Sequence, residues 1–341
     1  MAHVAMVVTN SCAPDPRVER HASWLAEMGH KVEIHAWDRE FEHPEIEIKS
    51  SYKIIRYRIG KNPTDNSVKT WFRKKKFIAN LSINPDILIL NDTDSMGVKF
   101  QGKTVLDIHD MAFTWPLMRG RGTLHKLASN RMLKQAGDAV AHADEIIVAA
   151  PNFRNWVGEF GKPATCVMNR RENQSNMKSS DKKVGFFGRI REYESISHLI
   201  DAAKIAGFDV VLAGDGFAVK QLLRDYPSLD YRGKFIESDL SDLMQEISVM
   251  YAMYDDSRAN IQLGAIPTKM LDAAAFGIPS VTNSGTPMGD LCLNEKIGTV
   301  APYGDKKRIA EAILEAYQME VKPKPSNDKL EFQNVIERLI A

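Results

Sequence analysis

The sequence has 341 residues, of which 44% are hydrophobic and 26% charged, with a formal net charge of +1. This length exceeds the roughly 250–300 residues at which single cores stop growing, so we expect two domains. The apolar content excludes a disordered chain, and the near-zero net charge gives no case for a nucleic-acid partner. No apolar run is long enough to span a membrane, and the three cysteines form no zinc, redox or disulfide pattern. We expect a cytoplasmic protein without a metal site or resident cofactor.

The first forty residues alternate between strand and helix patterns. His3–Val8 is a valine-rich run, apolar residues recur at helical spacing from Val18 to Leu25, and Lys31–Ala36 is a second apolar run. A βαβ unit of this length implies a parallel sheet with a right-handed crossover. Buried strands are expected at 87–90, 104–108 and 145–148, with a helix over 124–141. Together these elements predict a Rossmann-like domain over residues 1–168.

A second alternation begins near residue 183. We expect strands at 184–187, 210–213, 249–253 and 279–282, and helices at 196–205, 219–226 and 268–276. They predict a second Rossmann-like domain over 183–326, after a polar, turn-prone linker at 169–182. A helical pattern at about 327–341 is expected to pack back on the first domain. In such a pair of domains, ligands bind in the cleft at the carboxyl ends of the strands.

The helix predicted over 268–276 has an unusual start. Pro267 suits the first position of a helix, and Lys269 lies in the first turn, where a cation is unfavourable unless an anion is bound. Asp272 follows three residues later on the same helix face, within reach of a ribose. A bound phosphate would explain this pattern. The alternative is an ordinary buried helix with an exposed lysine.

This segment resembles the donor-site signature of retaining glycosyltransferases of the large family 4. The matching residues are Pro267, Lys269, Asp272, Ala273, Ala275, Gly277, Pro279 and Val281, with Asp272 in place of the usual glutamate. Similar family features follow in order along nearly the whole chain, at 15–20, 29–32, 106–110, 184–189 and 213–216. The resemblance implies an α/β protein with the GT-B fold, in which two doubly wound parallel sheets face each other across a cleft.

The resemblance also implies an activity. Members transfer a sugar from a nucleoside-diphosphate sugar to a glycan or lipid-linked acceptor, and we expect a hexosyltransferase of class EC 2.4 that retains anomeric configuration and needs no metal. Arginine, lysine and helix N-termini would stabilise the diphosphate leaving group. The donor-binding residues implied by the matching motifs are Gly188, Arg189, Gly214, Gly216, Pro267, Thr268, Lys269 and Asp272.

Three residues are expected in the first domain's part of the site. His109 matches the family's active-site histidine and would face the transferred sugar, as the catalytic residue. Without the resemblance, it would be interpreted as a hydrogen-bonded structural histidine between Asp107 and Asp110. Asn10 and Arg17, on the first loop, are expected at the lip of the cleft. A surface helix start would explain these last two residues equally well.

Two departures from the family pattern concern the donor site. The lysine that usually follows the Gly-Arg motif by five residues is replaced by Glu194, and the first of the family's two glutamates is replaced by Gly264. We therefore suggest Arg191 as an additional diphosphate ligand.

A basic and aromatic segment in the first domain indicates a possible membrane surface. Trp71, Phe72, Arg73, Lys74, Lys75 and Lys76 lie together, and Arg119, Arg121, His125, Lys126, Arg131 and Lys134 add a second basic stretch. Anionic lipid headgroups at the inner face of the cell membrane are the natural partner. The alternative is a solvated helix face whose aromatic residues enter the core.

Two other functions remain open at this point. A non-hydrolysing epimerase of nucleoside-diphosphate sugars would share the architecture, but it needs several acid and base residues around the sugar. A non-catalytic GT-B binding subunit would explain Glu194 and Gly264. A nicotinamide dehydrogenase is disfavoured, because no Gly-x-Gly-x-x-Gly motif follows the first strand.

Overall fold

A computed structural model describes residues 1–60, 67–120, 122–322 and 325–340, apart from the side chains of residues 67, 68 and 119. The chain divides into two compact units. The first unit comprises Met1–Met168 and Asn327–Ala341, and the second comprises Asn169–Ser326. Arg121, the side chain of Arg119 and the last residue of the expected C-terminal helix, Ala341, lie outside the described parts. Within the described ranges, every helix is too short or too polar to serve as a membrane span.

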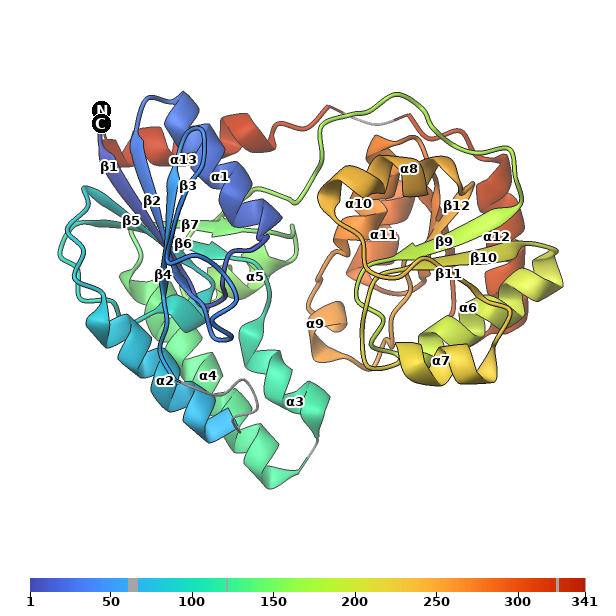
Figure 1. The fold of residues 1–341 in the computed structure, drawn as a ribbon, viewed down its shortest axis with the longest axis horizontal. Helices are drawn as coiled ribbons and strands as arrows, with labels where there is room; N and C mark the ends of the chain where they lie inside the picture. The colour runs from blue at the N-terminus through green and yellow to red at the C-terminus, as the bar shows by residue number, and fades with distance from the viewer. Residues whose placement is uncertain (61–66, 121, 323–324, 341) are drawn as a thin grey trace. The chain divides into compact units, whose positions relative to one another are not determined.

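The first unit is built on a sheet with the strand order β3-β4-β2-β1-β5-β6-β7-β8, in which only the β3–β4 pairing is antiparallel among the described residues (Figure 1). The order reverses direction between β1 and β5, which is the switch point where doubly wound sheets bind ligands. The elements are β1 (His3–Val8), α1 (Pro16–Glu27), β2 (Lys31–Trp37), β3 (Ile46–Ile48), β4 (Lys53–Tyr57), α2 (Ser67–Asn80), β5 (Ile87–Asn91), η1 (Thr93–Ser95), β6 (Lys103–Ile108), η2 (Ala112–Thr114), α3 (Trp115–Arg119), α4 (Thr123–His142), β7 (Glu145–Val148), α5 (Phe153–Gly158), β8 (Thr165–Cys166) and α13 (Asp328–Ile340).

Helix α13 completes the core of the first unit although it follows the second unit in the sequence. It lies beside α1 (Figure 1), and its Phe332, Val335 and Ile336 are fully buried in the cluster that contains Leu25. The ring of Phe332 also packs 4.3 Å from the ring of His21, measured between centroids. The amphipathic spacing of these residues explains why the segment folds as a helix on this surface.

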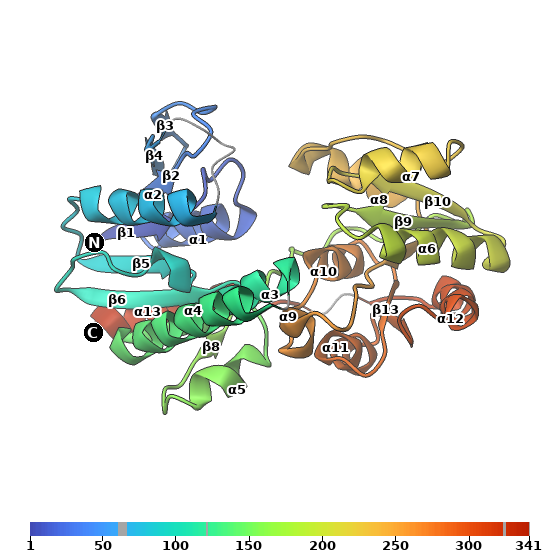
Figure 2. The same ribbon diagram turned by 90° about the horizontal axis from the view of Figure 1, so that it is seen from below.

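The second unit has a six-stranded, fully parallel sheet over its described residues, with the order β11-β10-β9-β12-β13-β14. Its direction reverses between β9 and β12, and α12 packs against α6 (Figure 2). The elements are β9 (Lys183–Phe187), α6 (Tyr193–Ala206), β10 (Asp209–Ala213), α7 (Val219–Asp225), β11 (Asp230–Tyr231), η3 (Glu237–Asp239), α8 (Leu240–Gln245), β12 (Val249–Tyr251), α9 (Ala259–Gln262), α10 (Thr268–Ala275), β13 (Ser280–Asn283), α11 (Pro287–Glu295), β14 (Gly298–Ala301) and α12 (Lys306–Gln318).

The polar stretch 169–182, which we expected to be a linker, contains no helix or strand. It nevertheless lies along the second unit and forms regular backbone contacts with it. The amides of Gln174 and Met177 donate to the carbonyls of Ala275 and Phe276 at 2.8 and 3.0 Å, and the Ser179 amide donates to the Ile247 carbonyl at 3.0 Å. The segment is therefore part of the second unit's surface rather than a free tether.

Candidate functional site

The second unit contains a pocket at its sheet switch point. Its walls come from the residues that follow β9 and β12 and from the start of α10, and the cavity measures about 250 Å³. Because β9 and β12 are adjacent parallel strands, the loops after them begin at the same sheet edge. The polar and glycine lining consists of Gly188, Arg189, Arg191, Glu192, Ser195, Arg258, Thr268 and Lys269. Four cations and one carboxylate therefore line this pocket, a composition that suits an anion.

Lys269 is the most unusual of these cations. Its side chain is only 7% exposed, and within the described structure its Nζ has no hydrogen-bond partner. The ammonium lies over the ring of Phe186, 3.0 Å from the centroid, in the first turn of α10, where the helix dipole disfavours a cation. Burial lowers the pKa of Lys269 well below its ordinary value, and the Glu192 carboxylate only partly opposes this. An anion in the pocket would relieve both penalties.

The two arginines after β9 are more exposed than Lys269. Arg189 is 66% exposed, and its Nη1 lies 2.8 Å from the Oδ1 of Asp215, while Arg191 lines the pocket from an exposed position. Both side chains can therefore turn toward a ligand without leaving a buried site. Glu194, which stands where the family's lysine is usual, is exposed in the first turn of α6.

Arg258 and Glu192 complete the pocket and were not anticipated by the sequence analysis. Arg258 precedes α9, Glu192 precedes α6, and the Nη1 of Arg258 donates to the Oε1 of Glu192. The other carboxylate oxygen of Glu192 accepts a bond from the backbone amide of Asp255 at 2.9 Å. Glu192 lies three residues after Arg189 of the Gly-Arg motif, which was a weak signal, whereas no pattern in the sequence points to Arg258.

Of the three glycines expected to contact the donor, only Gly188 lines the pocket. A Cβ on Gly214 would lie 1.8 Å from the Gly188 carbonyl oxygen, and one on Gly216 would lie 2.1 Å from the Ile190 carbonyl oxygen. Both glycines have positive φ angles, 132° and 156°. Both residues let two backbone loops of the protein approach each other, and the expected approach of ligand to Gly214 and Gly216 stays a prediction.

The start of α10 differs in part from the expectation. Pro267 is the residue before the helix and Thr268 lines the pocket, but Asp272 does not. The Asp272 carboxylate instead accepts a hydrogen bond from Nε of Arg171 at 3.2 Å. Since a carboxylate has further lone pairs, the ribose contact of Asp272 stays a prediction. Gly264, with a φ angle of 105°, adopts a backbone conformation that a glutamate would rarely take.

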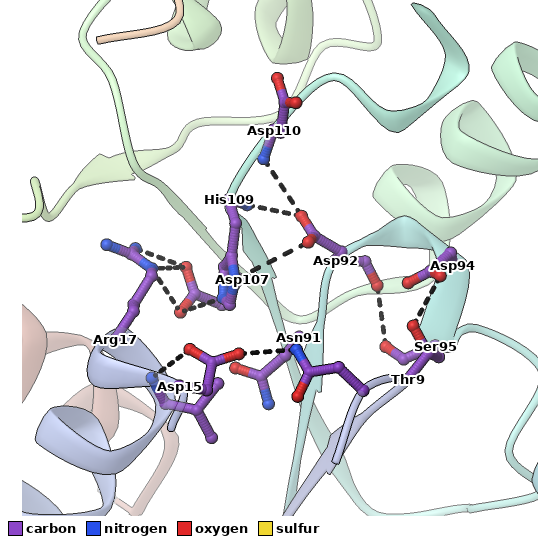
Figure 3. Close-up of polar contacts among 12 residues, drawn as sticks. Thr9, Asp15, Arg17, Asn91, Asp92, Asp94, Ser95, Asp107, His109 and Asp110 are labelled. Atoms are coloured by element: carbon purple, nitrogen blue, oxygen red, sulfur yellow. Dashed lines mark hydrogen bonds and ion pairs between the residues drawn. The ribbon is translucent and has the colours of Figure 1, made fainter. Parts of the chain in front are cut away.

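In the first unit, His109 lies between the buried carboxylate of Asp107 and the half-buried carboxylate of Asp92, at the carboxyl ends of β6 and β5 (Figure 3). Its Nε2 is 3.3 Å from Oδ2 of Asp107, and its Nδ1 is 3.7 Å from Oδ2 of Asp92. Burial alone would lower the pKa of His109, but the two carboxylates raise this pKa to about 9. The imidazole is therefore a cation at neutral pH.

Asp92 fixes the backbone around His109. Its Oδ1 accepts from the amides of His109 and Asp110, at 2.7 and 3.2 Å (Figure 3), and its own φ angle of 63° is unusual for a residue with a side chain. Burial raises the pKa of the Asp92 carboxyl to about 7, although His109 opposes the shift. The turn that follows β5 therefore positions His109.

Arg17 is not at the lip of a cleft, which corrects our expectation. It is 4% exposed, and its guanidinium donates to both carboxylate oxygens of Asp107 and to the Val167 carbonyl. Burial would raise the pKa of Asp107, but Arg17, His109 and His21 hold this pKa well below its usual range. Asn10 is exposed and shapes the first loop, since its amide donates to Asp15 and its carbonyl oxygen accepts from the Cys12 amide.

The basic segment of the first unit forms α2 and divides between surface and core. Phe72 is 61% exposed and Lys75 and Lys76 are exposed, whereas Phe77 is buried against Trp37. Trp71 is covered by Lys75 and by Arg131 of α4, at 4.0 and 4.8 Å from its ring centroid. Of Trp71, Phe72 and Phe77, only Phe77 enters the core, as the alternative interpretation of this segment predicted. A cavity of about 670 Å³ beside α2 and α4 is lined by Lys74, Lys75, Lys99, Arg131 and Lys134.

Comparison with solved structures identifies the fold of the protein. Sucrose-phosphate synthase from Thermosynechococcus elongatus is 15% identical, with a TM-score of 0.72 over 99% of this chain and 96% of that one. Anabaena HepE, in complex with UDP and glucose, is 14% identical, with a TM-score of 0.67 over 100% of both chains. WaaG, a glycosyltransferase involved in lipopolysaccharide biosynthesis, is 12% identical, with a TM-score of 0.61 over 99% and 95%. The predicted GT-B fold is confirmed.

A family model matches part of the sequence. Residues 181–319, most of the second unit and all of its pocket, match the model of the family Glycosyl transferases group 1. Among curated proteins, no sequence matches this chain. The second unit therefore matches glycosyl transferases group 1, and this match together with the fold supports a glycosyltransferase that uses a nucleoside-diphosphate sugar. In the described parts of the chain, no group of three or more His, Cys, Asp or Glu side chains could hold a metal ion.

Proposed function

We propose that the protein transfers a hexosyl unit to a glycan or lipid-linked acceptor, with retention of anomeric configuration and without a metal. The observation that carries this proposal is the buried Lys269 amine, which has no hydrogen-bond partner in the described structure and lines a pocket with three arginines. These cations supply the stabilisation of a diphosphate leaving group for which other transferases use a divalent ion.

The proposed roles of the residues follow from their positions. Lys269, Arg189 and Arg191 bind the donor diphosphate. Gly188 lets the backbone approach the diphosphate, and Thr268 offers its hydroxyl. His109 faces the transferred sugar as an imidazolium, which can donate a hydrogen bond to a sugar hydroxyl and is poorly suited to act as a general base. A base function for His109 would require it to lose a proton that Asp92 and Asp107 stabilise.

The first unit receives the acceptor in this proposal. The exposed Phe72, Lys75 and Lys76 of α2 combine apolar and cationic groups, as a helix at an anionic membrane surface does. This arrangement supports a peripheral position at the inner face of the cell membrane, where a lipid-linked acceptor would be available.

A thermal-shift panel tests the donor site. UDP-, GDP-, dTDP- and ADP-sugars are compared, because a ligand that binds only the folded state raises the melting temperature. We expect one nucleotide class to stabilise the wild type and not Lys269→Ala, whereas Lys204→Ala, which removes an exposed lysine of α6, behaves as wild type. Absence of a shift with every nucleotide sugar would favour a non-catalytic binding subunit.

Product analysis then tests the reaction. The donor that binds is incubated with and without a glycan acceptor and with and without EDTA, and the products are examined by NMR. We expect transfer that depends on the acceptor, persists in EDTA and keeps the anomeric configuration of the donor. A new nucleotide sugar formed without any acceptor would identify an epimerase instead.

A further inference from the structure

The donor pocket of this chain lacks a cation that the family pattern supplies. Glu194 occupies the position of the lysine that usually follows the Gly-Arg motif, and its side chain is exposed in α6. An acidic residue there provides no attraction for a diphosphate. If the proposed function is correct, this charge comes from other cations of the pocket, Arg191 among them.

Arg258 lies where such a cation is needed. It follows β12, and the loop after β12 begins at the same sheet edge as the loop 188–192 after β9. Arg258 lines the pocket together with Lys269, and its side chain is 22% exposed. A guanidinium in this position can present two parallel N–H donors to phosphate oxygens, which a lysine cannot do.

In the structure, Glu192 forms an ion pair with Arg258. It is the sole carboxylate among the described residues that line the pocket, and it accepts from the Arg258 guanidinium through Oε1. Its Oε2 is held by the amide of Asp255 at 2.9 Å, so the carboxylate stays fixed beside the cations. Glu192 also opposes the effect of burial on the pKa of Lys269. One carboxylate thus partly neutralises two cations.

We propose that Arg258, beside Arg191, is a diphosphate-binding residue that compensates for the missing lysine, and that Glu192 holds the Arg258 guanidinium until a nucleoside diphosphate takes over as its partner. This inference rests on the proposed donor site. A diphosphate carries more charge than a carboxylate and offers oxygens to both Arg258 and Lys269. Glu192 keeps its bond to Asp255, and its remaining negative charge repels the ligand, so it weakens binding of the donor and product alike.

A purely structural ion pair is the competing explanation. In that case Arg258 and Glu192 would only join the starts of α6 and α9, and removing either side chain would change stability without changing phosphate recognition. The two explanations differ in their effect on ligands that share the diphosphate and lack the base. Inorganic pyrophosphate is such a probe, because it reports the phosphate contacts alone.

The test is isothermal titration of pyrophosphate and of the nucleoside diphosphate that stabilises the wild type, with the corresponding nucleoside as a third ligand. We expect Arg258→Ala to bind both diphosphates about 10- to 100-fold more weakly, as loss of charge-assisted hydrogen bonds implies, and to leave the nucleoside affinity unchanged. The diphosphate affinity of Arg258→Lys should lie between those of the wild type and of Arg258→Ala. Glu192→Gln should bind both diphosphates several-fold more tightly. Arg308→Ala, an ion-paired arginine on α12 outside the pocket, is the matched control.

The outcomes separate this inference from the proposed function. If wild type binds a nucleoside diphosphate and folded Arg258→Ala binds it and pyrophosphate equally well, Arg258 is not a ligand. Weaker or equal diphosphate binding by Glu192→Gln overturns the assigned role of Glu192. If Arg258→Ala does not fold, Arg258→Lys with wild-type pyrophosphate affinity and unchanged salt dependence overturns the proposal. If wild type binds no diphosphate, the proposed donor site itself is wrong.

Discussion

Arg17 and Asp107 come from elements 90 positions apart and form an almost fully buried ion pair, with Nη2 of the arginine 2.6 Å from Oδ1 of the aspartate. Asp107 is the penultimate residue of β6, the strand that leads into His109, and it contacts His109 and His21 as well as Arg17. The pair therefore anchors α1 to the strand end that carries the candidate catalytic histidine. The buried carboxylate of Asp107 thus has three cationic or polar partners, and removing its charged partner would strongly destabilise the folded state.

We expect Arg17→Met to lower the free energy of unfolding of the first unit by about 3–5 kcal/mol, because it leaves a buried carboxylate without its main partner. All five tryptophans precede residue 157, so tryptophan fluorescence during urea unfolding reports this unit alone. Lys31→Met, which removes an exposed lysine paired with Glu33, is the control and should change stability by less than about 1 kcal/mol. Equal effects of the two variants would contradict the anchoring role.

The stability of the first unit should fall as the pH rises from about 6.5 to 9. The pKa of His109 is about 9 in the folded chain, above the usual value of 6.5, so proton binding favours the folded state. This contribution is complete below pH 6.5 and is lost as the pH passes 9, which corresponds to about 1–3 kcal/mol. Tryptophan fluorescence during urea unfolding, repeated across this pH range, measures the change in the free energy of unfolding. His109→Asn should flatten this part of the profile, whereas His142→Asn, at an exposed position on α4, should not.

Lys269→Met should make the second unit more stable and less able to bind nucleotide. The ammonium is buried without a hydrogen-bond partner in the described structure, so an apolar side chain of similar length removes a desolvation penalty of about 1–3 kcal/mol. Calorimetric melting gives the stability and titration with the preferred nucleoside diphosphate gives the affinity. Lys204→Met, on the exposed face of α6, should change neither. A destabilised Lys269→Met would mean that the amine has a structural partner.

Two glycine substitutions separate steric conflict from backbone strain. Gly214→Ala should lower the free energy of unfolding by at least about 3 kcal/mol, because the new Cβ would overlap the Gly188 carbonyl, which is backbone and cannot turn away. Gly207 has a positive φ angle of 74°, but a Cβ added there would meet nothing within 4 Å. Gly207→Ala should therefore lower the free energy of unfolding only through backbone strain, by about 1–2 kcal/mol. Calorimetry of the two variants makes the comparison, and similar melting temperatures would contradict it.

The membrane proposal can be tested by sedimentation with vesicles. We expect binding to vesicles of phosphatidylglycerol but not of phosphatidylcholine, with loss of binding as salt is raised. Lys75→Glu combined with Lys76→Glu should abolish it, because both side chains are exposed on α2. Lys306→Glu combined with Lys307→Glu changes the charge equally on α12 of the second unit and is the control. Binding that ignores both lipid charge and the α2 substitutions would exclude this surface.

The alternating strands and helices near the sheet switch points were predictable from the sequence. Buried parallel strands such as β1, β5 and β9 are short, continuous apolar runs, and their observed bounds differ from the predicted ones by at most a residue. Edge elements were missed for the opposite reason. Strand β3 has three residues, two of them exposed, and such a strand has no apolar periodicity to detect.

The site was predictable only where residues are close together in the sequence. Pro267, Thr268 and Lys269 share one motif, and Gly188 and Arg189 share another. The pair of Arg258 with Glu192 spans 66 positions, and the pair of Arg17 with Asp107 spans 90. Such partners meet because the topology brings distant strand ends to one sheet edge, which local patterns do not report.

The return of α13 to the first unit also determines the order in which the protein can mature on the ribosome. The second unit is encoded within the first, so residues 169–326 emerge and can complete their own core before α13 is translated. Until then, the surface that Phe332, Val335 and Ile336 will cover is exposed on the nascent first unit. The half of the enzyme that is synthesised first is therefore the half that finishes folding last.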